Sequence, residues 1–143
     1  MSVEENKAVV RRYIEELWGQ GNMALADELV SRDLVDHNPM PGQSPDYDGH
    51  HQVVQMFRAA FPDVQMTLED LIAEGDRVVD RWTMRATHTG NFAGMPATGK
   101  QFTIGGIDIS RLENGKIVEV WHQEDIISLM QQLGAIPAPA AAG

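Results

Sequence analysis

Alternation between apolar and polar positions is clearest near the end of the chain, over residues 116–123. Every second position there is a valine or an imidazole: Val118, Val120 and His122. A period of two is typical of a β-strand that shows one face to the core and the other to solvent. The pattern therefore predicts a strand whose inner face carries two valines and then His122.

The preceding segment, residues 100–112, alternates in the same way and carries one carboxylate. Its predicted inner face consists of Phe102, Ile104, Gly106, Asp108, Ser110 and Leu112. An aspartate and a histidine that face one apolar surface are candidate groups for acid/base chemistry. Whether they share that surface depends on the turn between the two strands.

Two turns fit the connection. In a three-residue hairpin loop, with Gly115 in the left-handed region, Asp108 lies opposite Val120. Asp108 and His122 are then diagonal neighbours, with Cβ atoms roughly 5–8 Å apart. A two-residue Asn114-Gly115 turn would shift the register by one and send the two side chains to opposite faces. The apolar pattern favours the three-residue loop, because it keeps both valines on the inner face.

The same patterns predict the remaining elements. Ser2 and Glu5 have capping-box spacing at the start of the first helix, and Asn22 is the expected cap of a short second helix. Asp125 follows the last strand and more simply caps the final helix than serves as a catalytic carboxylate. Helices are predicted at residues 2–18, 23–30, 49–61 and 126–133, an extended segment at 34–39, and further strands at 64–73 and 77–89.

Helices followed by a curved antiparallel sheet indicate an α+β fold. Wrapped around the N-terminal helices, such a sheet makes a cone whose mouth suits a ligand. We expect one domain over residues 1–136 and a disordered tail at residues 137–143, which are mostly Pro and Ala.

Composition excludes several classes of protein. The 143 residues include no cysteine, so disulfides, thiolate nucleophiles and cysteine metal sites are absent. A net charge of −10 argues against nucleic acid as a partner. The chain lacks the run of about 18 apolar residues that a membrane span needs, and its acidic N-terminus is unlike a signal peptide. A cytoplasmic location is therefore the expectation.

Several short motifs also occur in a characteristic order. They are Trp18, Val35-Asp36-His37-Asn38-Pro39, Phe61-Pro62-Asp63, Gly94-Met95-Pro96-Ala97-Thr98-Gly99-Lys100, Asn114-Gly115-Lys116-Ile117-Val118-Glu119 and Gln131-Gln132-Leu133-Gly134. In order and spacing the chain resembles the SnoaL-like polyketide cyclases, or ester cyclases, of the nuclear transport factor 2-like superfamily. That superfamily includes cyclases, isomerases, dehydratases, hydrolases and non-catalytic binders, so the resemblance is more specific for fold than for reaction.

The resemblance implies a cone-shaped α+β barrel with a deep cavity and a reaction that needs no cofactor. Polyketide cyclases of this type close a ring by an intramolecular aldol reaction, in which a carboxylate removes a proton beside carbonyl groups and a histidine assists. Alignment with them puts the family's carboxylate at His122 and its histidine at Asp108, so the pair is present but exchanged. A polar pocket position of the family falls on Val53.

The resulting hypothesis is an acid/base enzyme that acts on a small apolar carbonyl compound. His122, oriented by Asp108, would remove a proton α to a carbonyl, and His37 or Asn38 would hold the enolate oxygen. The histidines lack metal-ligand spacing, so no metal is expected. The expected substrate-binding wall comprises Trp18, Phe57, Trp82, Met84, His88, Phe92 and Met95.

Two alternatives remain open. The same pair could act on water or a hydroxyl in a hydrolase or dehydratase, or the domain could bind a small molecule or a second copy without turnover. A homodimer is expected, because an outward sheet face carrying Thr103, Ile107, Ile109 and Trp121 needs a cover. His50 and His51 are expected on the surface at the start of a helix, since neighbours on a helix point in different directions.

Overall fold

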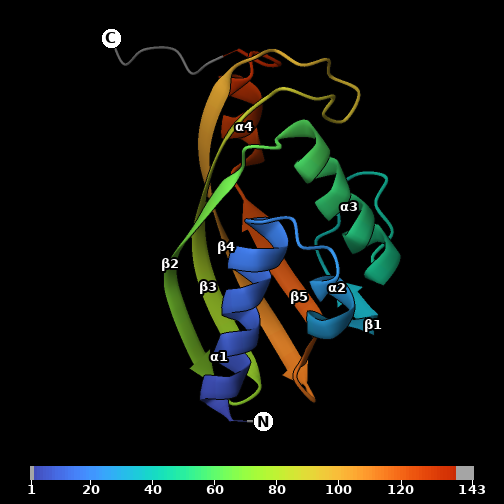
Figure 1. Cartoon of the computed structure of the whole chain (residues 1–143), viewed down its shortest axis with the longest axis vertical. Helices are drawn as coiled ribbons and strands as arrows, with labels where there is room; N and C mark the ends of the chain where they lie inside the picture. The colour runs from blue at the N-terminus through green and yellow to red at the C-terminus, as the bar shows by residue number, and fades with distance from the viewer. Residues whose placement is uncertain (1, 138–143) are drawn as a thin grey trace.

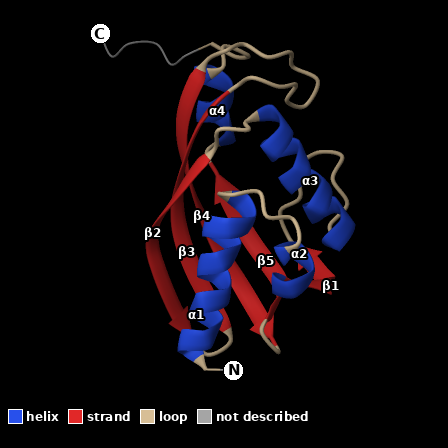
Figure 2. Ribbon diagram, in the orientation of Figure 1, coloured by secondary structure: helices blue, strands red, loops and turns tan. Residues whose placement is uncertain are grey.

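The computed structural model describes residues 2–137, in which one curved sheet is covered by helices on its concave side (Figures 1 and 2). The five strands lie in the order β1-β5-β4-β3-β2. The predicted α+β architecture is confirmed, whereas the expected tail beyond Pro137 lies outside the described residues. The elements are α1 (Val3–Arg12), η1 (Tyr13–Trp18), α2 (Leu25–Leu29), β1 (Val30–Asp36), α3 (Tyr47–Ala60), β2 (Gln65–Glu74), β3 (Arg77–Thr87), β4 (Gln101–Glu113), β5 (Lys116–Glu124) and α4 (Ile126–Gln132).

Helix α1 begins at the predicted capping box. The Ser2 hydroxyl accepts a hydrogen bond from the N–H of Glu5, and the Glu5 carboxylate accepts one from the N–H of Ser2. These bonds satisfy donors that have no partner within the helix itself. The helix packs against β2 and β3 and buries Val10 completely.

The first helix continues as a π-helix, η1, which changes the set of side chains that faces the sheet. The N–H of Gly19 donates to the carbonyl of Ile14, five residues earlier, at 3.1 Å. This wider spacing brings Trp18 to the side of Tyr13 and Ile14, and all three line a cavity. Helical segments of this kind are rare and often occur at functional sites.

The turn between β4 and β5 differs from the three-residue loop that the apolar pattern favoured. Asn114 and Gly115 form a two-residue turn, and both have positive φ, 50° and 77°. Positive φ at both positions is typical of a type I′ hairpin turn. Taken alone, that turn would put Asp108 and His122 on opposite faces.

A β-bulge in β5 restores the common face. The register shifts between Arg111 and Leu112 of β4, so that Val118 of β5 is the extra residue. As a result Asp108 lies directly opposite His122, where the expected register made them diagonal. Ile117, and not Val118, takes the buried position at the start of the strand.

Two other features differ from the sequence-based expectations, and a third agrees with them. The short helix α2 has no side-chain cap, so the predicted role of Asn22 is wrong. The extended segment predicted at 34–39 belongs to β1, which pairs in parallel with β5 in an otherwise antiparallel sheet. Asp125 does cap α4, since its carboxylate accepts a hydrogen bond from the N–H of Ser128.

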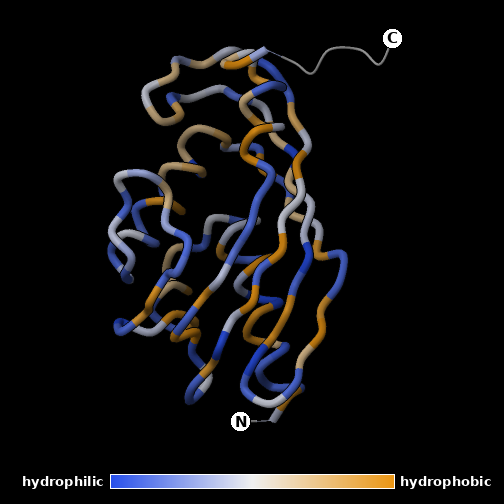
Figure 3. The backbone as a smooth tube through the Cα atoms, turned by 180° about the vertical axis from the view of Figure 1, so that it is seen from behind, coloured by the Kyte–Doolittle hydropathy of each residue, from blue (hydrophilic) through white to orange (hydrophobic). Residues whose placement is uncertain are grey.

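Alternation along the strands separates a buried face from an exposed one (Figure 3). On β3, every second residue from Val78 to Ala86 is buried. Ile72, Ile107 and Ile109 are partly or largely exposed on the other face, and the homodimer expected to cover that face stays a prediction. No helix in the described part of the chain is long and apolar enough to cross a membrane.

Close packing at Gly106 gives a test of the sheet register. A Cβ at this position would lie 2.1 Å from the Trp82 ring, which lies directly opposite on β3. We therefore expect Gly106→Ala to destabilise the fold by about 1–3 kcal/mol, the usual cost of overpacking. Gly105→Ala is the matched control, because its Cβ would meet nothing closer than 3.5 Å. Urea unfolding of both variants measures the difference, and equal stability would contradict the register.

Candidate active site

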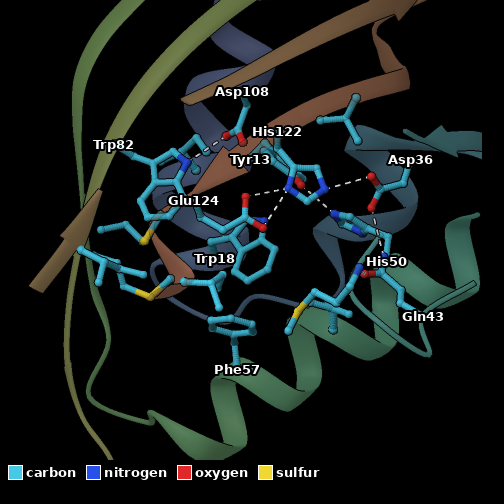
Figure 4. Close-up of a pocket in the computed structure, with 18 residues that line it drawn as sticks. Tyr13, Trp18, Asp36, Gln43, His50, Phe57, Trp82, Asp108, His122 and Glu124 are labelled. Carbon is cyan, nitrogen blue, oxygen red and sulfur yellow. Dashed lines mark hydrogen bonds and ion pairs between the residues drawn. The ribbon is translucent and has the colours of Figure 1, made fainter. Parts of the chain in front are cut away.

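A narrow cavity of about 70 Å³ lies between the concave face of the sheet and the helices η1 and α3 (Figure 4). Ligand pockets for drug-sized molecules are usually about 300–1,000 Å³, so this cavity is small. Its wall is mainly apolar and is made by Ile14, Trp18, Met40, Val53, Phe57, Met66, Trp82, Met84, Ile104, Val120 and Ile126. The polar residues that reach it are Tyr13, Asp36, Gln43, His50, Asp108, His122 and Glu124.

The imidazole of His122 lies between two carboxylates. Its Nε2 is 2.9 Å from an oxygen of Asp36, and its Nδ1 is 2.7 Å from an oxygen of Glu124. Figure 4 shows these contacts on either side of the ring. Among the described residues no hydrogen bond joins His122 to Asp108, so Asp36 and Glu124 orient the ring, and Asp108 does not.

Both carboxylates reach the ring through strand geometry. Asp36 shares the buried face of β1 with Leu34 and ends that strand, while Glu124 lies two residues beyond His122 on β5. Asp36 also accepts hydrogen bonds from the N–H of Asn38 at 2.9 Å and from Gln43 Nε2 at 3.0 Å. Burial alone would raise the pKa of Asp36, but these bonds and the one from His122 outweigh it and lower the pKa.

The two carboxylates keep His122 protonated. Burial of the ring lowers its pKa, but the hydrogen bonds that it donates to Asp36 and Glu124, together with their negative charges, outweigh burial and raise the pKa to about 10. An imidazolium donates from both ring nitrogens and accepts no proton. His122 is therefore a cation at neutral pH, and the expected role of general base does not suit it.

Asp108 is the buried carboxyl group that opens to the apolar part of the cavity. Asp108 is 8 % exposed and accepts a hydrogen bond at 3.0 Å from the indole N–H of Trp82. Burial raises the pKa of Asp108 to about 6, although hydrogen bonds and the charge of His122 oppose the rise. A carboxylate with a pKa near the working pH suits proton abstraction.

Tyr13 and His50 form a second polar pair in the cavity wall. The Tyr13 hydroxyl is 2.6 Å from His50 Nε2, and His50 Nδ1 is buried without a partner among the described residues. Burial lowers the pKa of His50 to about 4 and raises that of Tyr13, so both are neutral. An unpartnered buried N–H is rare in proteins. The tautomer with hydrogen on Nε2 is therefore favoured, which leaves the phenol hydrogen free to turn into the cavity.

The structure separates the sequence-predicted residues into two groups. His122 and Asp108 line the cavity, as do Trp18, Phe57, Trp82 and Met84. His37 and Asn38 do not line the cavity. His37 is stacked on Trp121 outside the cavity and bonds to Glu119, and the Asn38 amide oxygen accepts a hydrogen bond from the N–H of His122. Neither can hold a substrate oxygen in this geometry.

Three further candidates lie away from the cavity. His88 is fully buried, and its Nδ1 contacts the Thr98 hydroxyl at 3.0 Å. Phe92 packs against Phe57 and Phe61 in the core, and Met95 pairs with Phe92 through backbone hydrogen bonds. None of the three lines this cavity, and their place in a substrate-binding wall stays a prediction.

Sequence reasoning missed Asp36, Glu124 and His50, although each follows a readable pattern. Asp36 is two residues after Leu34, and Glu124 is two residues after His122, which is the spacing of one strand face. His50 precedes Val54 by four residues and Phe57 by seven, the spacing of one helix face. The expectation that His50 lies on the surface is wrong, because it belongs to the apolar stripe of α3, where it is 5 % exposed.

Comparison with known proteins identifies the family. The family model described as SnoaL-like polyketide cyclase matches residues 8–133. The chain belongs to this family. No curated protein sequence matches this SnoaL-like chain at a significant level.

Solved structures agree with the family and vary in described activity. A candidate polyketide cyclase from Bacillus cereus is 31% identical, with a TM-score of 0.81 over 92% of this chain and 82% of its own. IdmH, a candidate polyketide cyclase from Streptomyces antibioticus, is 31% identical, with a TM-score of 0.78 over 90% and 98%. AclR, a candidate hydroxylase from Streptomyces galilaeus, is 26% identical, with a TM-score of 0.84 over 98% and 87%. The SnoaL-like fold therefore leaves the reaction to be argued from the site.

The charge of His122 can be measured directly. We expect ¹⁵N NMR to find both ring nitrogens protonated at pH 7–8, with titration near pH 10. The folded-state pKa lies above the ordinary value of about 6.5. The stability that this proton contributes is thus fully present below pH 6.5 and is lost as the pH rises through 10. A ring that titrates near 6.5 would contradict the double ion pair.

Proposed function

We propose that this protein catalyses proton abstraction α to a carbonyl group, followed by aldol-type ring closure, in a small and largely apolar carbonyl compound. Asp108 is the general base. The observation that carries the proposal is a buried carboxyl group with a raised pKa, open to an apolar cavity, beside a histidine that is already protonated. Membership of the SnoaL-like polyketide cyclase family supports the type of reaction.

The proposed sequence of steps needs one base and one donor. The Asp108 carboxylate takes a proton from the carbon next to a carbonyl, and the C–H electron pair becomes an enolate. The enolate carbon attacks a second carbonyl carbon of the same molecule and forms the new C–C bond, and the resulting alkoxide takes up the proton held by Asp108, which restores the carboxylate. An apolar cavity favours these steps, because a carboxylate that has lost its hydration shell is a stronger base.

Tyr13 is the proposed donor to the developing oxyanion. Its hydroxyl is neutral, lines the cavity and is held by His50 at 2.6 Å. A donor that is fixed before the reaction needs little reorganisation in the transition state. In this scheme Tyr13 replaces His37 and Asn38, which lie outside the cavity.

The size of the cavity limits the substrate that can enter without a change of shape. An engineered apolar cavity of about 150 Å³ accepts benzene, and this one is about half that volume. A ring-forming substrate must therefore displace part of the wall. Met40, Met66 and Met84 line the cavity, and methionine side chains adapt readily to different shapes.

A second candidate is the addition of water or the removal of a hydroxyl group by the same base. The structural similarity to AclR, a candidate hydroxylase, supports a reaction other than cyclisation as the second candidate. The mass of the product formed in H₂¹⁸O separates the two candidates. Ring closure leaves the mass of the substrate unchanged, addition of water raises the mass and labels the product, and removal of a hydroxyl group as water lowers the mass. A binding module without turnover would bind the same compounds and leave them unchanged.

Asp108→Asn tests the base. We expect at least about a 100-fold loss of turnover, the usual scale of acid/base assistance, with the cavity intact because the amide is nearly isosteric. The measurement is solvent deuterium exchange at the α-carbon of small ketones and β-keto esters. In the parent protein the rate should fall below pH 6, where Asp108 becomes protonated.

Asp70→Asn is the matched control for that variant, since Asp70 is an exposed carboxylate that pairs with Arg81. It should exchange deuterium at the parent rate. Full activity in Asp108→Asn would remove the proposed mechanism.

Tyr13→Phe tests the donor. We expect turnover to fall by about 10- to 1,000-fold, as when one oxyanion donor is removed, with little change in the acid limb of the pH profile. Tyr47→Phe is the control, because the Tyr47 hydroxyl bonds to Asp27, which does not line the cavity. Equal turnover in the two phenylalanine variants would exclude Tyr13 as the donor.

A further inference from the structure

A second carboxyl group, that of Asp80, lies beside Asp108 and is neither the proposed base nor the proposed donor. Asp80 is on the buried face of β3, between Val78 and Trp82, and is 0 % exposed. It is directly opposite Asp108 on β4. Neither of its oxygens has a hydrogen-bond partner among the described residues.

Within residues 2–137, no cation lies next to Asp80 on the neighbouring strands to compensate a charge. Leu71 is opposite it on β2, Asp108 is opposite on β4, and the Tyr13 hydroxyl is the titratable group from the helical side. On the next strand, β5, His122 and Glu124 lie beyond Asp108. The arginines of β3 are on its exposed side, where Arg81 pairs with Asp70.

The protonation states of two facing carboxyl groups depend on each other. Both are acceptors when ionised, so a hydrogen bond between them requires a proton on one. Asp108 has a donor in Trp82 and the positive charge of His122 nearby, whereas Asp80 has neither. The proton therefore belongs on Asp80 and the negative charge on Asp108.

We propose that Asp80 is a positioning residue that donates a shared proton to Asp108, so that the base of this enzyme is a two-carboxyl pair with a single negative charge. The inference rests on the proposed function of Asp108. During reaction Asp108 takes the substrate proton, both carboxyls become neutral, and the negative charge moves to the enolate. The bond from Asp80 holds the Asp108 carboxylate in place and limits how basic it becomes.

The pKa shifts of the two groups have the directions that this division requires. Burial and the facing Asp108 raise the pKa of Asp80 far above its ordinary range. Burial also raises the pKa of Asp108, but the facing Asp80 opposes that rise. A buried acid without other partners is costly to the fold, and such conflicts are expected mainly at functional sites.

The direct test is a ¹³C NMR titration of the aspartate carboxyl groups, with the two signals assigned from Asp80→Asn and Asp108→Asn. We expect Asp80 to stay protonated through pH 8 while Asp108 ionises at lower pH. Asp80→Asn keeps a neutral donor and should move the Asp108 transition by less than about half a pH unit. Asp80→Leu removes the donor and should raise the transition by about one unit or more.

Two results would overturn the proposal. One is an Asp80 signal that ionises near pH 4 in the unaltered protein, which needs no variant to fold. The other is a fall of about one unit or more in the Asp108 transition in Asp80→Asn, since that would mean that a negative charge had been removed. Deuterium exchange decides the function separately, so an active Asp108→Asn would end the proposed mechanism without changing the titration.

Stability provides a second measurement that needs no substrate. The folded-state pKa of Asp80 lies above its unfolded value of about 3.9, so its contribution is fully present below pH 4 and is lost as pH rises toward the folded pKa. Asp80→Asn should therefore have a higher urea midpoint than the parent protein at pH 8, and a smaller difference at pH 5. A lower midpoint at pH 8 would contradict a protonated Asp80. Asp70→Asn should show no such pH-dependent difference.

Discussion

The double ion pair of His122 determines the chemistry that the rest of the cavity can perform. Asp36 and Glu124 occupy both ring nitrogens, and the resulting imidazolium cannot accept a proton at neutral pH. The ion pair also joins the end of β1 to β5, where Asn38 bonds to the backbone of His122. The two contacts therefore join two sides of the cavity wall, and they leave no ring nitrogen of His122 free to accept a proton.

The proposed base is a carboxyl group whose properties depend on where the sheet buries it. Asp108 and Asp80 face each other on the neighbouring strands β4 and β3, on the buried face of the sheet, and both have raised pKa values. A natural core rarely keeps two acids together unless they serve a purpose, since apolar residues of the same size would be more stable.

The structural relatives show that one fold is described with more than one activity. Chains with the same fold and 26–31% identity are described as candidate cyclases and as a candidate hydroxylase. A cavity enclosed by a curved sheet and helices can serve several reactions, and the chemistry depends on a few side chains. The resemblance implies that this chain exchanges the family's carboxylate and histidine positions, and the proposed roles fit that expectation. In the proposal His122 is a cation held between two carboxylates, and Asp108 takes the proton.

Local patterns in the sequence predicted most of the elements and many of the faces that they bury, although His50 and Val118 were placed on the wrong side. The period of two placed Asp108 and His122 on one face, and the capping box and the cap at Asp125 were correct. These features depend on neighbours a few residues apart, so the chain itself encodes them. The register of the β4–β5 hairpin could not be predicted from local patterns, because the two-residue turn and the bulge at Val118 shift the pairing in opposite directions. Only the tertiary structure brought Asp36 to His122 and Asp80 to Asp108, since the charge of each group depends on partners that lie far away in the sequence.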